Sequence, residues 1–304
     1  MDLFNATAGT TMSAASNSVL SVPTYVDAST GMTSSEVKHG VDELQGQHNS
    51  TASIAVQVLS IESRLSNELN RLLFSPPVAY VYNPLNYAWE THSMFVTKFG
   101  NTKKQILFVG MNPGPWGMVQ TGIPFGAARL VQDWLGIVGT VGQPPVEHPQ
   151  RRVQGFQCPR TEVSGQRFWG FFRDICITPE NMFKNSFVYS YCPLSFMHTS
   201  GRNITPPELK SSDRQAIMEM CDSSLAQIIT VLQVDIVIGI GKFAEYRIRE
   251  TVKKNSLNVT IGCILHPSPI NPSANKGWKE AVLKSMQEMN ILHIVRGDQL
   301  HQCI

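Results

Sequence analysis

The chain has 304 residues, of which 42% are hydrophobic and 16% are charged, and its formal net charge at pH 7 is +2. These values are typical of a globular protein with a buried core, and they exclude a largely disordered chain. The small net charge neither requires nor excludes nucleic acid as a partner, because a local basic surface matters more than the total. No apolar run reaches membrane-spanning length, so we expect no membrane partner.

The cysteines are widely separated and include no Cys-x-x-Cys pair. This spacing argues against a zinc or iron–sulfur site and against a dense disulfide framework. Reduced thiols in a cytosolic or nuclear protein are the simplest account. We therefore expect neither a metal ion nor a cofactor.

Residues 1–55 are dominated by Ser, Thr, Ala and Gly, with few large apolar residues recurring at any period. Such a segment buries too little apolar surface to offset the entropy of ordering, so the sequence predicts a disordered N-terminal tail. Residues 56–304 form the expected single domain. Apolar residues from Ile61 to Leu73 recur at helical spacing, and Ser75-Pro76-Pro77 ends this predicted helix.

Beyond this helix, short apolar runs alternate with longer amphipathic segments. Residues 78–89 and 139–165 show no period, which predicts a packed aromatic loop and a long surface excursion. Near-continuous apolar strands separated by helices indicate an α/β fold, with a mostly parallel four-stranded sheet in a three-layer α/β/α sandwich. The expected strands are 105–109, 186–191, 235–241 and 259–265, with a further edge at 291–295; the expected helices are 126–135, 166–177, 212–232, 242–254 and 276–289.

The first central strand runs into a loop, Gly110 to Gly126, that is rich in glycine and proline. Its backbone can neither continue the sheet nor start a helix at once, so the loop is expected to be rigid and to bring its amides close to a ligand. Asn112 is the polar side chain at its entry. The last predicted strand ends in a similar loop, His266 to Pro272.

Three strands thus end in polar residues, namely Asn112, Ser190 and His266. The carboxyl ends of parallel strands share one edge of the sheet, where ligands bind in open α/β folds. We therefore expect these three side chains to face one cleft.

The sequence Gly239-x-Gly241-Lys242 invites a phosphate-loop interpretation. The full pattern fails, because Ile236 holds the first glycine position and Phe243 the Ser/Thr position. A tight strand-to-helix turn is the better interpretation. An unrelated nucleotide-binding enzyme is therefore a weaker hypothesis than the two that follow below.

The two loops together resemble those of the single-strand-selective monofunctional uracil-DNA glycosylases, within the uracil-DNA glycosylase superfamily. The resemblance runs from about residue 59 to residue 295. It is carried by the following stretches: Gly110-Met-Asn-Pro-Gly-Pro-Trp-Gly-Met118, Thr121-Gly-Ile-Pro-Phe-Gly126 and His266-Pro-Ser-Pro-Ile-Asn-Pro-Ser-Ala-Asn-Lys-Gly-Trp278, with support from Glu162-Val-Ser-Gly165 and Tyr191-Cys-Pro-Leu194.

The resemblance implies an enzyme that flips uracil or a 5-modified uracil such as 5-hydroxymethyluracil out of DNA and hydrolyses its N-glycosidic bond. Asn112 matches the residue that holds the attacking water, and His266 the residue that stabilises the departing base at O2. Phe125 matches the ring on which the base stacks. The loops carry no lysine nucleophile, which agrees with a monofunctional enzyme that initiates base-excision repair. Further residues implied to contact the base are Met111, Gly114, Met118 and Ser190.

The second loop is implied to engage DNA, single- or double-stranded, in a monomeric protein of the nucleus. The implied DNA contacts are Ser268, Pro269, Ile270, Asn271 and Lys276; other basic side chains that could follow phosphates are Lys103, Lys104, Arg151, Arg152 and Lys279.

Two departures from the family pattern stand out. Ser190 replaces an Asn that reads the amide edge of uracil, with Tyr189 replacing the His before it, and Ile270 replaces the Arg that wedges into the vacated stack. A serine hydroxyl cannot make the two-point contact of an amide. The alternative hypothesis is therefore a lesion- or DNA-binding homologue with weak or altered base specificity.

Overall fold

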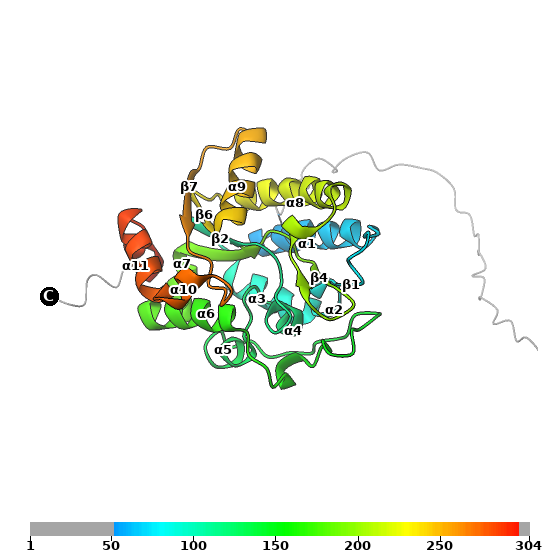
Figure 1. Ribbon diagram of the computed structural model, residues 1–304. Coiled ribbons are helices and arrows are strands. Elements are labelled where there is room, and N and C mark those ends of the chain that lie inside the picture. The colour runs from blue at the N-terminus through cyan, green and yellow to red at the C-terminus, as the bar shows by residue number, and fades with distance from the viewer. Residues whose placement is uncertain (1–51, 298–304) are drawn as a thin grey trace, which may run out of the picture. The chain divides into compact units, whose positions relative to one another are not determined.

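The computed structural model describes residues 52–297. The tail predicted for residues 1–55 lies outside them except for its last residues, and the first helix begins at Ile54. The centre is a parallel sheet of four strands in the order β3-β2-β6-β7 (Figure 1). Its members are the four predicted strands, observed as β2 (Ile106–Gly110), β3 (Ser186–Ser190), β6 (Ile236–Ile240) and β7 (Thr260–Ile264).

The strands are parallel because their connections carry helices across the sheet. Strands β2 and β3 are buried at every position, as expected for strands covered on both faces. Their register pairs Gly110 with Ser190 at the carboxyl end. The chains leaving these two strands therefore start side by side, which places both exits at one edge.

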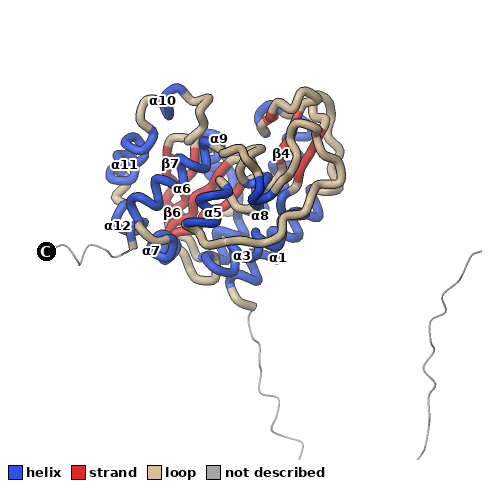
Figure 2. The backbone as a smooth tube through the Cα atoms, turned by 90° about the horizontal axis from the view of Figure 1, so that it is seen from below, coloured by secondary structure: helices blue, strands red, loops and turns tan. Residues whose placement is uncertain are grey.

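Two groups of helices cover the sheet and complete the predicted three-layer fold (Figures 1 and 2). On one side α1 packs against α8, and α8 against α9; on the other, α6 packs against α7, α11 and α12. The first group is α1 (Ile54–Leu69), α8 (Ser211–Leu232) and α9 (Lys242–Lys254); the second is α6 (Val163–Cys176), α7 (Pro179–Asn185), α11 (Trp278–Glu288) and α12 (Leu292–Arg296).

Helix α6 supplies the aromatic half of the core. Phe168 and Phe172 lie on its sheet-facing side and meet Phe108 of β2 edge to face, with ring centroids 6.5 and 5.3 Å apart. Edge-to-face pairs add roughly 0.5–1.5 kcal/mol each to the burial of the rings. This packing fixes the start of α6 beneath the loop that follows β2.

A second sheet corrects the prediction of a packed loop over residues 78–89. The segment forms a short strand and a helical turn before α3, and its strand pairs with chain from beyond β3 in an antiparallel sheet of order β1-β4-β5. The elements are β1 (Tyr80–Tyr82), α2 (Pro84–Tyr87), α3 (Trp89–Phe99), β4 (Ser195–Met197) and β5 (Asn203–Ile204).

The edge strand predicted for residues 291–295 is wrong, because Leu292–Arg296 is helix α12, which packs against α6 and α7. The segment 139–165, predicted to be a surface excursion, is partly buried. Val153 lies in the core, and the last residues of the segment form the start of α6. The remaining helices are α4 (Met118–Thr121), α5 (Ala128–Asp133) and α10 (Pro272–Asn275), with 3-10 turns η1 (Gly155–Gln157) and η2 (Pro206–Glu208).

Among residues 52–297, the helices are all too short or too polar to cross a membrane.

Candidate active site

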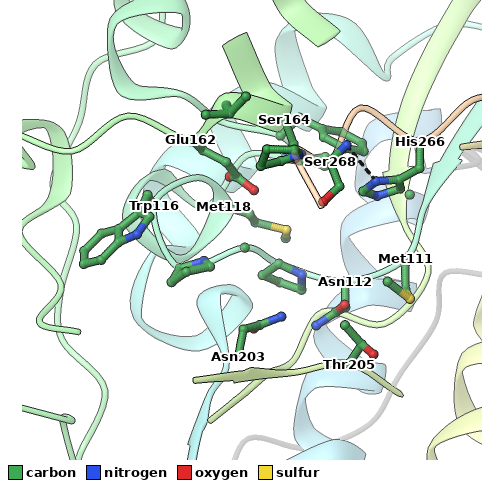
Figure 3. A pocket seen from close by; sticks show the side chains of 18 of the residues that line it. Met111, Asn112, Trp116, Met118, Glu162, Ser164, Asn203, Thr205, His266 and Ser268 are labelled. Atoms are coloured by element: carbon green, nitrogen blue, oxygen red, sulfur yellow. Dashed lines mark hydrogen bonds between the residues drawn. The ribbon is translucent and has the colours of Figure 1, made fainter. Parts of the chain in front are cut away.

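A cavity of about 570 Å³ opens at the carboxyl ends of β2, β3 and β7 (Figure 3). Asn112, Ser190 and His266 all line it, so the prediction that three strand exits face one cleft is confirmed. The volume suits a small planar ligand. Most of the other predicted site residues also line it: Met111, Gly114, Met118, Phe125, Ser268, Pro269, Ile270 and Asn271.

The side chain of Asn112 is held in one orientation. Its Nδ2 donates to the carbonyl oxygen of Leu194 at 3.2 Å, which leaves Oδ1 as the group that can accept a hydrogen bond within the site. The backbone beside it is tied to the chain after β3, because the Cys192 N–H donates to the Met111 carbonyl at 2.9 Å. An acceptor on a fixed backbone can orient a water molecule but cannot act as a strong base.

His266 is held as a neutral hydrogen-bond donor. The Ser268 N–H donates to Nδ1 at 3.1 Å, so Nδ1 carries no proton and Nε2 carries it. Burial lowers the pKa of His266 to about 4. Gly241 makes room for this ring, since its φ is +91° and an added Cβ would lie 2.9 Å from the His266 Cβ. At neutral pH the site therefore contains an uncharged imidazole with a fixed tautomer.

Phe125 provides a flat apolar surface beside these polar groups. Its ring stacks on Phe168 of α6, with centroids 4.4 Å apart and planes 18° apart, and its centroid lies 6.4 Å from that of His266. Its φ of +55° is rare for an aromatic residue and costs about 1–3 kcal/mol. Strain of this size at a cavity wall is typical of a functional position.

Ser190 offers a ligand in the cavity fewer hydrogen bonds than the amide of an Asn would. Its hydroxyl donates to the Cys192 carbonyl at 3.2 Å, so only its oxygen lone pairs remain to accept a hydrogen bond. Tyr189 points the other way, into the core, where its hydroxyl meets that of Ser224 at 2.9 Å. Altered base recognition at Ser190 stays a prediction, and the hydrogen bond of Ser190 to the Cys192 carbonyl is the local reason for it.

The loop after β7 is braced at its base and open at its tip. Arg167 of α6 donates to the Pro267 carbonyl at 3.0 Å and to Asn275 Oδ1 at 2.8 Å, and Asn275 donates to the Pro269 carbonyl at 2.8 Å. Ile270 at the tip is 89% exposed. Lys276, predicted to contact DNA, is exposed at the end of α10 (Pro272–Asn275), outside the cavity lining.

One of the predicted phosphate contacts needs correction. Lys104 is buried and donates to the Phe183 carbonyl and to Thr102 Oγ1, because its side chain turns inward from the start of β2. Lys279 pairs with Asp174 on the surface, and its phosphate contact stays a prediction. Arg151 and Arg160 instead flank the ring of Trp116, with guanidinium carbons 5.1 and 4.8 Å from its centroid. This cationic stack lies beside the cavity.

Glu162, just before α6, also lines the cavity, although no role for it was predicted. Its Oε2 is buried and has no hydrogen-bond partner. Burial raises the pKa of Glu162 to about 7. A single glutamate before a helix gives no signal of its own in the sequence. Other lining residues that the sequence did not predict are Trp116, Ser164, Asn203 and Thr205.

Within residues 52–297, no group of three or more His, Cys, Asp or Glu side chains is placed to hold a metal ion.

The fold has a counterpart among solved structures. The WT SMUG2 protein of Pedobacter heparinus superposes with a TM-score of 0.59, at 18% sequence identity, over 80% of this chain and 100% of its own. At this identity the likeness shows a shared α/β fold.

Sequence relatives define the family more narrowly. The sequence profile of the uracil DNA glycosylase superfamily matches residues 97–288. The single-strand selective monofunctional uracil-DNA glycosylase of Rattus norvegicus is 46% identical over 246 residues, which cover 81% of this chain and 88% of its own length. The corresponding protein of Bos taurus is 47% identical over 246 residues, covering 81% and 90%.

The chain therefore belongs to the uracil DNA glycosylase superfamily. By family, it is an enzyme of the DNA glycosylase class.

Proposed function

We propose that the protein extrudes uracil, or uracil carrying a polar group at C5 such as 5-hydroxymethyluracil, from DNA and hydrolyses its N-glycosidic bond. The observation that carries this proposal is the convergence of Asn112 and His266 on a cavity walled by the Phe125 ring. The sequence relatives reported above bear the name of single-strand selective monofunctional uracil-DNA glycosylases.

In the proposed reaction, the C1′–N1 bond breaks first and its electron pair passes to the base. Asn112 Oδ1 orients the water that then adds to C1′. Because an amide cannot remove a proton from water before attack, bond breaking has to run ahead of bond making. The proton lost by the water ends on the departing base, so the products are free uracil and an abasic deoxyribose.

His266 is proposed to stabilise the negative charge that develops on the base. Its neutral Nε2–H donates a hydrogen bond to O2 of the base. Because the imidazole is uncharged, it makes this hydrogen bond without giving up a proton to the leaving group. Removal of one preorganised donor of this kind typically costs about 3–4 kcal/mol of the barrier. Phe125 contributes stacking, worth roughly 1–3 kcal/mol per base.

The monofunctional outcome is supported by the composition of the cavity. Among the described residues that line it there is no lysine, so no amine is available to form a Schiff base with the abasic sugar. Ile270 is proposed to fill the space left by the extruded base as an apolar wedge. We propose a monomer that acts in the nucleus, where its DNA substrate lies.

The test is release of free base from labelled oligonucleotides, single-stranded and duplex, each with one uracil or one 5-hydroxymethyluracil. We expect release of both and an intact abasic strand that breaks only after alkali. Absence of release at enzyme excess, from either base and either strand form, would refute the proposed function.

A second candidate is a lesion-binding homologue without turnover, and the limited recognition at Ser190 favours it. This candidate predicts tight binding to abasic DNA with no release of base. Asn112→Ala should then leave the binding unchanged.

A further inference from the structure

We infer that Trp116, Arg151 and Arg160 form a phosphate-binding site for the DNA strand that carries the extruded base. This inference rests on the proposed function, because it assumes that the nucleotide in the cavity belongs to a DNA strand. It assigns a partner to the cationic stack beside the cavity, namely the phosphodiester backbone next to the extruded nucleotide.

Trp116 places this site at the rim of the cavity. The residue is half-buried, belongs to the same loop as Asn112 and lines the cavity. Figure 3 shows Trp116 and His266 at opposite ends of the group of side chains around the cavity. The cationic stack therefore lies on the side of the cavity away from His266.

Two guanidinium groups meet the ring of Trp116, and neither has an acidic partner. Their carbons lie 5.1 Å (Arg151) and 4.8 Å (Arg160) from the ring centroid. Among residues 52–297, neither group forms an ion pair. Two cations held on one ring without a carboxylate produce a positive potential at the rim, which favours binding of an anion.

The cationic stack also carries N–H groups without acceptors. Within the described part of the chain, the Arg160 guanidinium and the indole N–H of Trp116 make no hydrogen bond. Arg151 donates to the Gly201 carbonyl at 2.9 Å and, through Nη1, to the Gln150 carbonyl at 3.1 Å, which leaves its Nη2. Guanidinium and indole nitrogens are donors only. A group of donors of this kind matches the oxygens of a phosphate.

The position of the cationic stack identifies the anion. When a base is flipped into a cavity, the sugar-phosphate backbone of its strand stays at the rim. Guanidinium groups at the rim can therefore reach a phosphate of that strand without contacting the complementary strand. In this respect the site differs from Ile270, whose proposed role needs a base stack, so the site serves single-stranded and duplex DNA alike.

The first test is the salt dependence of binding by the full chain to a single-stranded oligonucleotide with one tetrahydrofuran abasic analogue, measured by fluorescence anisotropy. Each phosphate that a protein neutralises on a single strand contributes about 0.7 to the slope of log K against log salt. We expect Arg160→Gln to reduce this slope by about 0.7 and Arg160→Lys, which keeps the charge, to preserve it. Because the Arg160 guanidinium makes no hydrogen bond within the described chain, its loss should leave the fold intact.

Arg173→Gln is the matched control for the loss of one positive charge. Arg173 lies near the end of α6, whose start lines the cavity, and its side chain is 52% exposed. This variant should leave the salt slope unchanged.

A second measurement locates the phosphate. The phosphates on either side of the abasic analogue are replaced one at a time by uncharged methylphosphonates. Replacement at the contacted position should weaken binding by the wild type several-fold and leave binding by Arg160→Gln nearly unchanged, because the variant has already lost the interaction.

An unchanged salt slope in Arg160→Gln would overturn the inference, and so would equal sensitivity of the two proteins to every methylphosphonate. Neither measurement needs turnover. If the wild-type chain releases no base, the proposed function fails, which is a separate result from loss of the phosphate-binding site.

Discussion

The two loops that meet across the cavity are built differently. The loop from Gly110 to Gly126 is largely buried, and its Gln120 donates to the carbonyls of Pro115 and Arg152, both at 3.1 Å. The loop from His266 to Pro272 is anchored at its base but exposes Ile270 at its tip. We interpret the first as the rigid part that holds water and base, and the exposed tip of the second as the part that meets DNA.

The two loops differ in how much substitution they tolerate. The first loop keeps Asn112 and Phe125, which the resemblance assigned to the water and the base. Its hydrogen bonds to the Leu194 carbonyl before β4 and to the Arg152 carbonyl before η1 leave little freedom for substitution. The departures from the family pattern, Ser190 and Ile270, lie outside it. Substitutions at Asn112 and His266 on one hand, and at Ser190 and Ile270 on the other, should therefore separate catalysis from recognition.

The largest effect is expected at the anchored base of the second loop. His266→Ala should lower the single-turnover rate of uracil release about 10²–10³-fold, because the charge on O2 loses its only proposed side-chain donor. Rapid-quench measurement with enzyme in excess gives this rate directly. Binding of abasic DNA should change much less.

The pH profile of the wild type provides the control for this interpretation. The pKa of His266 is lowered from 6.5 to about 4, so the side chain stays neutral as the pH falls from 8 to 5. The stability that this shift contributes is complete above pH 6.5 and is lost as the pH falls through 4, since the unfolded chain binds the proton first. A loss of activity centred near pH 6.5 that disappears in His266→Ala would contradict a neutral donor.

A smaller gain is expected at Ser190. Because the serine hydroxyl is committed to the Cys192 carbonyl, Ser190→Asn would add both an acceptor and a donor for the amide edge of uracil. We predict that kcat/KM for uracil rises by up to about tenfold, the value of one good hydrogen bond. Ser200→Asn, on an exposed turn, serves as the control. An unchanged or lower rate would show that Ser190 is not the recognition position.

The smallest effect is expected at the tip of the second loop. Ile270→Ala should lower excision from duplex DNA several-fold and leave excision from single strands unchanged, because only a duplex has a stack to be filled. Val138→Ala, which alters another exposed apolar side chain, should affect neither. Equal losses on both strand forms would remove the wedge role from Ile270.

Much of the fold could be predicted because its signals are local. The four central strands are short apolar runs, and the glycines and prolines after β2 indicate a loop. Residues 291–295 were predicted as a strand but form a helix, because a short apolar run fits a strand as well as a buried helix. Packing against α6 and α7 decided for the helix.

The rest of the site depends on contacts between distant parts of the chain. Asn203 and Thr205 reach the cavity through the small β1-β4-β5 sheet, whose pairing no local pattern reveals. Glu162 stood in a stretch that matched the family, yet its unpartnered oxygen became visible only beside Gly114 and Gly117. The sequence around Lys104 is that of a surface cation, and only the tertiary structure shows that its side chain is buried.

The most direct test of the account is uracil release from a single-stranded oligonucleotide by wild type and by Asn112→Ala, with both proteins in excess over DNA. The account predicts release by the wild type and a loss of about 10²-fold or more in the variant, since a water without its acceptor is no longer positioned. Abasic-site binding should persist in both. Equal release by the two proteins, or binding of abasic DNA with release by neither, would contradict it.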